Sequence, residues 1–446
     1  MRTASGDERQ DHDAQGGREA QGSHGEGHEA GHEEDHEEVF PFVPAPEDGT
    51  RWTAPTDVEQ QLYRLTRTGN AYAYLRVLAI EGVYYPVRLD EARAAGEDEF
   101  PMLTVPLGDG RVAAQVYTAG LLPRTHPHLV YEYATLGALA GILPGDVDIL
   151  AVNAATPCEE YFSTDDDERE TWLDLHHDLF EPDGLGDRVV TRRTGAPPPG
   201  PLLHGLACGA HLCFQNGDAW NTPHWHGSGY RGEVGRIAAG WGVHGREDWR
   251  STQERLLGLE VSPWHWDFVL GARVALAPGG RGGHVDPQRW RALVEAELRA
   301  RARENGVPAD DPEFAEMIAD LRTLVGEVLR YEARFRADGL LPPDGFVRTI
   351  AAWDIGRGSN MARWGRGARY ATEAETLAAL ERASKAARDA YGSWEEFSAG
   401  YVLGRCLHFD EERFGSWYTE VLDAHRALTV DPESPWRTVP FTGEPG

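Results

Sequence analysis

The sequence predicts an α+β protein in which a disordered N-terminal tail precedes a small α/β domain and a larger all-α domain. Three observations predict this class: large apolar residues are almost absent before Val39, strand-like and helix-like runs alternate up to about residue 165, and only helical spacing follows Leu202. The 446 residues also exceed what one hydrophobic core usually serves. We expect a His- and acid-rich tail at 1–45, the α/β domain at 52–165, an acidic and Pro-rich linker at 166–201, and the all-α domain at 202–432.

Histidines recur every four residues in the tail, and two of the segments between them, His28–His32 and His32–His36, match H-E-x-x-H. The zinc-protease motif needs a rigid helix that holds two histidines and a general-base Glu in a walled cleft. Here the flanks are glycine and acid, so we expect a solvated tail and no cofactor, with weak binding of divalent metal ions as the alternative. These histidines are His24, His28, His32 and His36.

The net charge of −30 creates a field that repels phosphate backbones and anionic lipids, so we expect neither nucleic acid nor membrane as a partner. The four cysteines lack zinc or disulfide spacing and are predicted to be reduced, mostly buried thiols. No stretch is typical of a signal peptide or of a membrane span, which needs about 20 apolar residues. We therefore expect a cytoplasmic protein. Lys385 is the single lysine among 43 basic residues, which indicates a high-GC, bacterial genome.

The α/β domain is expected to begin with a helix at 57–65 and a strand at 83–87. Two strands at 102–106 and 112–117 flank the tight turn Gly108-Asp109-Gly110, which predicts a hairpin. Helical spacing predicts a helix at 129–143 that ends before Pro144, and a compact apolar run predicts a buried strand at 147–152. A further helix is expected at 172–179.

These residues resemble the N-terminal domain of the SseB family. In that family a strand ending near a "vFTS" element precedes a helix and a strand closing on "lxlNPgs". The corresponding segments here are Val116-Tyr117-Thr118-Ala119 and Val152-Asn153-Ala154-Ala155. The resemblance covers about 100 residues and implies an interaction or regulatory module rather than a known catalyst.

Only helices are expected after Leu202. Asp286-Pro287 and Asp311-Pro312 each place an N-cap before proline, and Thr372 with Glu375 forms a capping box. The aromatic run 264–267 is expected in the core. The expected helices are 203–214, 231–240, 246–259, 264–274, 287–304, 312–331, 347–363, 372–390, 393–408 and 414–428.

A polar and aromatic cluster on two of these helices is the candidate functional site. Trp353, Asp354 and Arg357 share one flank of the first helix, because residues three and four apart are neighbours on a helix surface. The second helix carries a stripe of aromatics that ends in a guanidinium, with Gly404 leaving room for a neighbouring helix. The full set is Trp353, Asp354, Arg357, Arg363, Trp394, Tyr401 and Arg405.

Two interpretations of this cluster remain open. In the first, the aromatics and paired charges hold the helices together, with Asp354 satisfying Arg357 or Arg405. In the second, arginines and aromatics line a pocket for an anionic or planar ligand, or Asp354 acts as an acid, a base or a metal ligand. His224 and His226 form an H-x-H pair that is a weaker candidate for zinc.

The cluster also carries a resemblance to the bacterial domain of unknown function 1266 family, also called YbeR/YbeU-like. The resemblance rests on 352–357, 362–363, 368–375, 393–397 and 401–405, together with the upstream segments 240–243 and 246–259. It implies the fold and the key positions, but no activity. The sequence departs from the family at Cys406-Leu407-His408, where an aromatic often follows Gly-Arg.

We therefore expect a non-catalytic protein-interaction or regulatory module with a protein partner. The alternative is an enzyme or anion-binding domain that uses the Asp/Arg/aromatic cluster. The residues alone leave open whether the protein is an enzyme.

Overall fold

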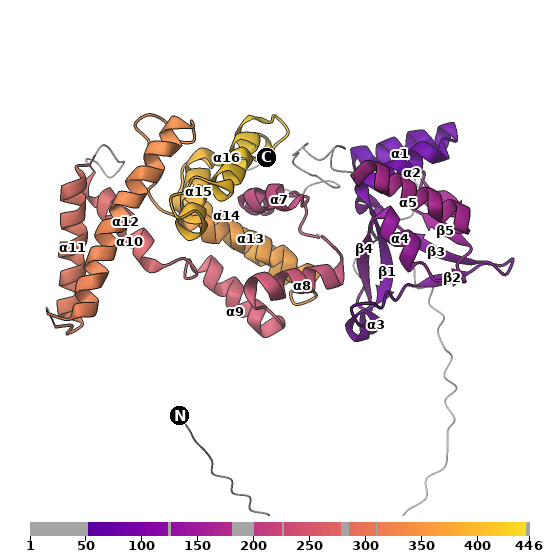
Figure 1. Ribbon diagram of the computed structural model, residues 1–446, viewed down its shortest axis with the longest axis horizontal. Coiled ribbons are helices and arrows are strands. Elements are labelled where there is room, and N and C mark those ends of the chain that lie inside the picture. Colours follow the sequence, from indigo (N-terminus) through magenta and orange to yellow (C-terminus); the bar gives the residue numbers. More distant parts are fainter. Residues whose placement is uncertain are drawn as a thin grey trace, which may run out of the picture. The chain divides into compact units, whose positions relative to one another are not determined.

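The computed structural model describes residues 52–123, 126–180, 200–224, 227–277, 285–308 and 310–442, all within one compact unit, Phe42–Gly446 (Figure 1). Within these residues the fold is α+β, as predicted, with a helical C-terminal part. The domain boundaries themselves stay a prediction. The expected disordered tail and its histidines, His24, His28, His32 and His36, lie outside the described residues, as does His226.

Strands of the α/β part form two small sheets. Strand β1 (Val83–Arg88) pairs antiparallel with β4 (Leu129–Ala134), and the other sheet has the order β2 (Thr104–Pro106), β3 (Val112–Val116), β5 (Ile149–Val152) and β6 (Glu160–Ser163). The predicted hairpin is confirmed, because β2 and β3 pair antiparallel. Strands β3 and β5 run parallel, so their carboxyl ends lie at one edge.

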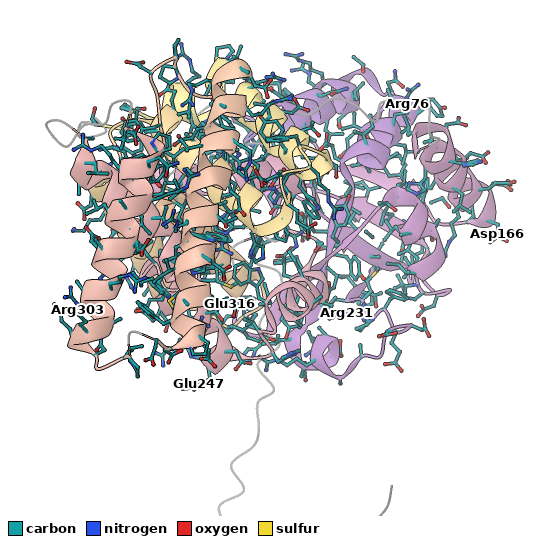
Figure 2. All side chains as sticks on the ribbon, turned by 60° about the vertical axis from the view of Figure 1, so that its left-hand side comes forward. Arg76, Asp166, Arg231, Glu247, Arg303 and Glu316 are labelled. Atoms are coloured by element: carbon teal, nitrogen blue, oxygen red, sulfur yellow. The ribbon has the colours of Figure 1, made fainter. Side chains whose placement is uncertain are left out.

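Helices α1 (Asp57–Thr68), α2 (Ala71–Glu81) and α5 (Asp166–Phe180) gather on one side of these strands (Figure 1). The acid run predicted as the start of a linker forms the first turn of α5, where carboxylates favour the positive end of the helix dipole. Asp166 projects outward from that turn (Figure 2). Two short helices, α3 (Leu89–Ala94) and α4 (Leu136–Ile142), complete the part.

The helix predicted over 129–143 is wrong in its first half. Residues Leu129–Ala134 form β4, and Thr135 then caps α4 by accepting from the Ala138 N–H at 3.2 Å. The segment carries the β-branched and aromatic residues Val130, Tyr131 and Tyr133, and its pairing with β1 satisfies backbone groups that a lone helix end would leave open.

The helical part largely matches the predicted helices. Gly209 divides the predicted 203–214 into two helices, and a short last helix was missed. The N-caps at Asp286 and Asp311 and the Thr372 capping box are confirmed. The helices are α6 (Pro201–Cys208), α7 (Ala210–Asn216), α8 (Tyr230–Trp241), α9 (Arg246–Leu257), α10 (Trp264–Leu276), α11 (Pro287–Glu304), α12 (Pro312–Ala337), α13 (Ala351–Gly367), α14 (Glu373–Ala390), α15 (Trp394–Phe409), α16 (Ser416–Val430) and α17 (Pro435–Thr438).

Helix α13 is buried from Ala351 to Gly365 and packs against α6, α7, α8, α9, α14 and α15. Glycines allow this approach: a Cβ at Gly365 would lie 2.0 Å from Trp249 Nε1, and one at Gly358 would lie 2.9 Å from Leu257 Cδ2. The helix is therefore the centre of the C-terminal part.

Helix α13 starts at Ala351, four residues later than predicted. The segment before it is fixed by buried side chains: Glu332 accepts from the Val347 N–H at 2.8 Å, and Asp267 accepts from the Ile350 N–H at 3.0 Å. The Tyr391 hydroxyl accepts from the Ala352 N–H at 2.8 Å. Long-range partners thus take the N–H groups that a helix start leaves free.

Helix α8 links the helical part to the α/β part. Its residue Tyr230 belongs to the core of the α/β part, and Glu132 on β4 accepts from the Arg231 N–H at 3.1 Å. The Arg231 guanidinium lies 3.4 Å from the same carboxylate and donates to the carbonyl of Glu99 at 2.7 Å. Burial raises the pKa of Glu132 to about 7.

Candidate functional site

Asp354 lies in the first turn of α13 with 1% of its surface exposed. Its Oδ2 accepts from the backbone N–H groups of Val261 and Ser262 at 3.2 and 3.1 Å. Its Oδ1 accepts from the Ser262 hydroxyl at 2.7 Å and from the Arg357 guanidinium. The carboxylate therefore joins α13 to the turn between α9 and α10.

Arg357 is the partner of Asp354, as the first interpretation allowed. Its Nε donates to the Trp353 carbonyl at 3.0 Å, and its guanidinium lies 4.2 Å from the centre of the Trp353 ring and 5.5 Å from that of Trp241. Burial lowers the pKa of Arg357, and Asp354 opposes this effect. The pair is nearly closed from solvent, with side-chain exposures of 10% and 1%.

Tyr401 brings α15 against α13. Its ring meets Trp353 edge-on at 5.0 Å and stacks on His211 of α7 at 4.3 Å. The predicted role of Gly404 is confirmed, because a Cβ there would lie 2.6 Å from the Cβ of Trp353. The two predicted helices therefore meet along this polar-aromatic seam, which we define as Trp353, Asp354, Arg357, Tyr401 and Arg405.

A buried histidine pair missed from the sequence lies beside the seam. The Ser398 hydroxyl lies 2.9 Å from Nε2 of His211 and 2.8 Å from Nδ1 of His425. A hydroxyl donates one proton, so it donates to one ring and accepts from the other. Burial lowers the pKa of His425 to about 4 and that of His211 well below its usual value. Both rings are thus neutral near pH 7.

Arg405 reaches the surface end of the seam rather than Asp354. Its Nη2 lies 3.4 Å from Oε2 of Glu420, and its guanidinium is 5.1 Å from the Trp417 ring centre and 5.6 Å from that of Phe409. Phe409 and Trp417 stack on each other at 4.8 Å. Both rings are substantially exposed, at 37% and 45%.

We define the aromatic rim as the exposed rings His408, Phe409 and Trp417. His408 contacts Phe409 at 4.4 Å, and its ring centre lies 6.5 Å from that of buried Trp266 on α10. Trp264 was expected in the core but is 54% exposed. The exposure of a ring depends on which helices cover it, so the sequence alone could not predict the rim.

Arg363 and Trp394 do not join the seam. Arg363 donates through Nε to the Thr222 carbonyl at 3.0 Å and through Nη1 to Cys213 Sγ at 2.9 Å, which ties α13 to the segment after α7. Trp394 stacks on His204 at 4.7 Å and on Trp436 at 5.7 Å, and meets Phe441 edge-on at 4.8 Å. Both are buried in packed surroundings.

The weaker metal candidate His224 has other partners. Its Nδ1 accepts from Arg366 Nε at 3.4 Å, and its Nε2 lies 3.7 Å from Glu373. No group of His, Cys, Asp and Glu that could hold a metal ion occurs among the described residues. The predicted thiols are confirmed, since all four cysteines are free and buried.

A second buried ion pair was also missed by sequence reasoning. Arg273 of α10 donates to both oxygens of Glu332 at 2.7 Å and lies 4.4 Å from the Trp290 ring centre. The two residues lie 59 positions apart, on α10 and α12, so no local spacing could reveal the pair. It fastens the α10–α12 side of the core to the start of α13.

Residues 236–441 match the model of a family described as protein of unknown function (DUF1266). The matched residues include the seam and the rim, and the match confirms the resemblance predicted for the C-terminal half. They do not include the α/β part. No curated protein and no solved structure matches the chain.

Proposed function

We propose that this protein is a non-catalytic protein-interaction or regulatory module whose helical part presents the aromatic rim to a partner protein. The observation that carries the proposal is the exposed Phe409–Trp417 stack above the buried Arg405 guanidinium. Aromatic residues and arginine are enriched at the centres of protein interfaces. Clustered exposed rings are also unusual on a surface that binds nothing.

The surroundings of Asp354 support an interaction role over catalysis. Both of its oxygens accept hydrogen bonds from Ser262, and Arg357 neutralises its charge. A general acid or base must reach its substrate, whereas this carboxylate is 1% exposed. The alternative, an enzyme or an anion-binding domain at the seam, keeps support from the arginines, which retain unpaired N–H groups.

We further propose that the α/β part is SseB-like. The segments that carry the resemblance follow parallel strands β3 and β5. Asn153 Oδ1 accepts from the Thr118 N–H at 2.9 Å and from its hydroxyl at 3.3 Å, which joins the two segments. These hydrogen bonds give the two resembling segments a common structural role, which supports the SseB-like proposal.

The proposed setting is the cytoplasm of a bacterial cell, with a protein partner and neither nucleic acid nor membrane. The net charge of −30 supports the exclusion of polyanions. None of the helices in the described part of the chain has the length and apolarity that crossing a bilayer requires.

A capture experiment with the full chain as bait tests this proposal. Phe409→Ala with Trp417→Ala should remove the captured partners while leaving the unfolding transition nearly unchanged. Tyr161→Ala, which removes a ring that is 55% exposed on β6, is the matched control and should retain them. Partners that bind the rim variant as well as the wild type would rule out the rim.

Arg357→Ala and Arg405→Ala extend the same experiment to the seam. Loss of partners without loss of stability would favour an interaction role for the seam. Unfolding would instead favour the interpretation in which the seam only holds helices together.

A further inference from the structure

The seam ends in guanidinium groups that are incompletely paired. Arg357 uses Nε for the Trp353 carbonyl and Nη2 for Asp354 and Ser262, which leaves Nη1 without an acceptor among the described residues. This nitrogen is not one of the buried unpaired atoms, so it retains access to solvent.

Arg405 is paired even less. Only Nη2 has an acceptor within the described part of the chain, at the long distance of 3.4 Å from Glu420, and Nε is buried without one. Glu420 is a loose partner, because its side chain is 55% exposed and remains solvated. The Arg405 side chain, by contrast, is only 9% exposed, so water satisfies it poorly.

Tyr401 adds a third unpaired donor. Its hydroxyl is buried with no hydrogen-bond partner in the described structure, and both Arg405 and Arg357 lie close enough to oppose the rise in its pKa that burial causes. Asp354, the buried carboxylate of the seam, is already occupied. Donors therefore exceed acceptors where the seam meets the rim.

We propose that Arg357 and Arg405 form an anchor for an acidic side chain of a partner protein, whose apolar neighbour packs on the aromatic rim. A carboxylate supplies the missing acceptors and fits the planar guanidinium fork. The anchor specifies which kind of side chain the proposed interaction surface would bind, and it rests on that proposed function.

The structure favours an acidic side chain over other anions. Polyanions such as nucleic acids are repelled by the net charge of −30. A terminal carboxylate is usually captured by backbone N–H groups, whereas acidic motifs are read by arginine side chains, which are the donors present here.

Three dye-labelled peptides test the anchor with the full chain by fluorescence anisotropy: acetyl-Leu-Glu-Phe-amide, its neutral Gln counterpart, and the Gln peptide with a free terminal carboxylate. We expect the Glu peptide to bind about tenfold more tightly than either Gln peptide, as a charge-assisted contact allows. Arg405→Gln should remove that difference, and Arg426→Gln, which changes an exposed arginine on α16, should not.

Glu420→Gln provides a test that does not risk the fold. It removes the internal competitor for Arg405, so the Glu peptide should bind several-fold more tightly to this variant than to the wild type, by roughly the strength of an exposed pair. Weaker or unchanged binding would overturn the anchor.

Equal binding of the Glu and neutral Gln peptides would also overturn it, as would preferred binding of the free-carboxylate peptide. If, in either of these cases, the peptides bind the wild type but not the Trp417→Ala variant, the anchor fails and the proposed rim surface survives. If no peptide binds and the rim variant captures the same partners as the wild type, both fail.

Discussion

At the scale of single residues, the seam is governed by a few buried polar atoms. Sequence spacing correctly placed Asp354, Arg357 and Trp353 together, because i, i+3 and i, i+4 neighbours are fixed by helix geometry. It could not place Ser262 on Asp354 or Ser398 between two histidines, since these contacts join segments that are far apart in the sequence. Arg363 shares the helix but faces another neighbour, which only the packing of α13 decides.

Asp354→Asn should destabilise the protein by about 3–5 kcal/mol, because it leaves the buried Arg357 charge without compensation. Urea unfolding would measure this loss. Asp423→Asn removes a carboxylate that is 67% exposed in its pair with Arg426, so the change should stay within about 0.5 kcal/mol. A small effect at Asp354 would mean that the seam does not hold the helices.

His425 should make stability fall in acid. Its folded pKa of about 4 lies below the ordinary value of 6.5, so the unfolded chain takes up a proton first as the pH decreases. The contribution is fully present above pH 6.5 and is lost progressively towards pH 4, by about 3 kcal/mol at most. Urea midpoints between pH 7 and 5 should fall less steeply for His425→Asn than for the wild type. Parallel curves would contradict the assignment.

At the scale of elements, helix ends with local signals were predictable and ends set by distant contacts were not. Asp286 and Asp311 cap their helices where the sequence places them, since an N-cap is a local interaction. Val347 is held out of α13 by Glu332 on another helix, and β4 follows from pairing with β1. The apolar residues of 129–143 fit either periodicity until a partner strand is present.

Gly404→Ala tests how closely α13 and α15 must approach. The added methyl would meet the Cβ of Trp353 at 2.6 Å, so we expect a loss of about 1–3 kcal/mol in thermal or urea unfolding. Gly271→Ala on α10 is the matched control: nothing lies within 4 Å of its Cβ, and it should stabilise by roughly 0.5–1 kcal/mol. Two similar effects would show that the close approach is unimportant.

At the scale of the whole molecule, the junction at Glu132 makes the fold sensitive to pH near neutrality. A raised carboxyl pKa means that the folded state keeps a proton which the unfolded chain has released. The stabilising contribution is present below the ordinary pKa of about 4.5 and is lost as the pH rises through about 7. Its sign is opposite to that of His425.

The stability of the Glu132→Gln variant relative to the wild type should therefore increase as the pH rises. The difference in unfolding free energy, variant minus wild type, should shift in favour of the variant between pH 6 and pH 8. Glu91→Gln, in an exposed pair with Arg88, should show no such shift. If this difference does not vary with pH, the pKa of Glu132 is not raised in the folded protein.

Helix α6 packs on α14, although only α14 lies in the part of the chain that matches the family model. A Cβ at Gly205 would lie 2.1 Å from the Leu380 carbonyl oxygen, so α6 sits directly against α14, yet α6 and α7 precede the residues that match the family model. A fragment of residues 236–441 would expose the face of α14 and the ring of Tyr401 that His211 covers.

We expect this fragment to bind hydrophobic dye and to aggregate, whereas a fragment of residues 200–442 should melt cooperatively. The part of the chain that matches the family model is therefore expected to be smaller than the unit that folds on its own. Around Gly356, α13 packs directly against the Cys208 carbonyl and the Tyr401 ring, so it should be the last helix to lose its hydrogen-exchange protection.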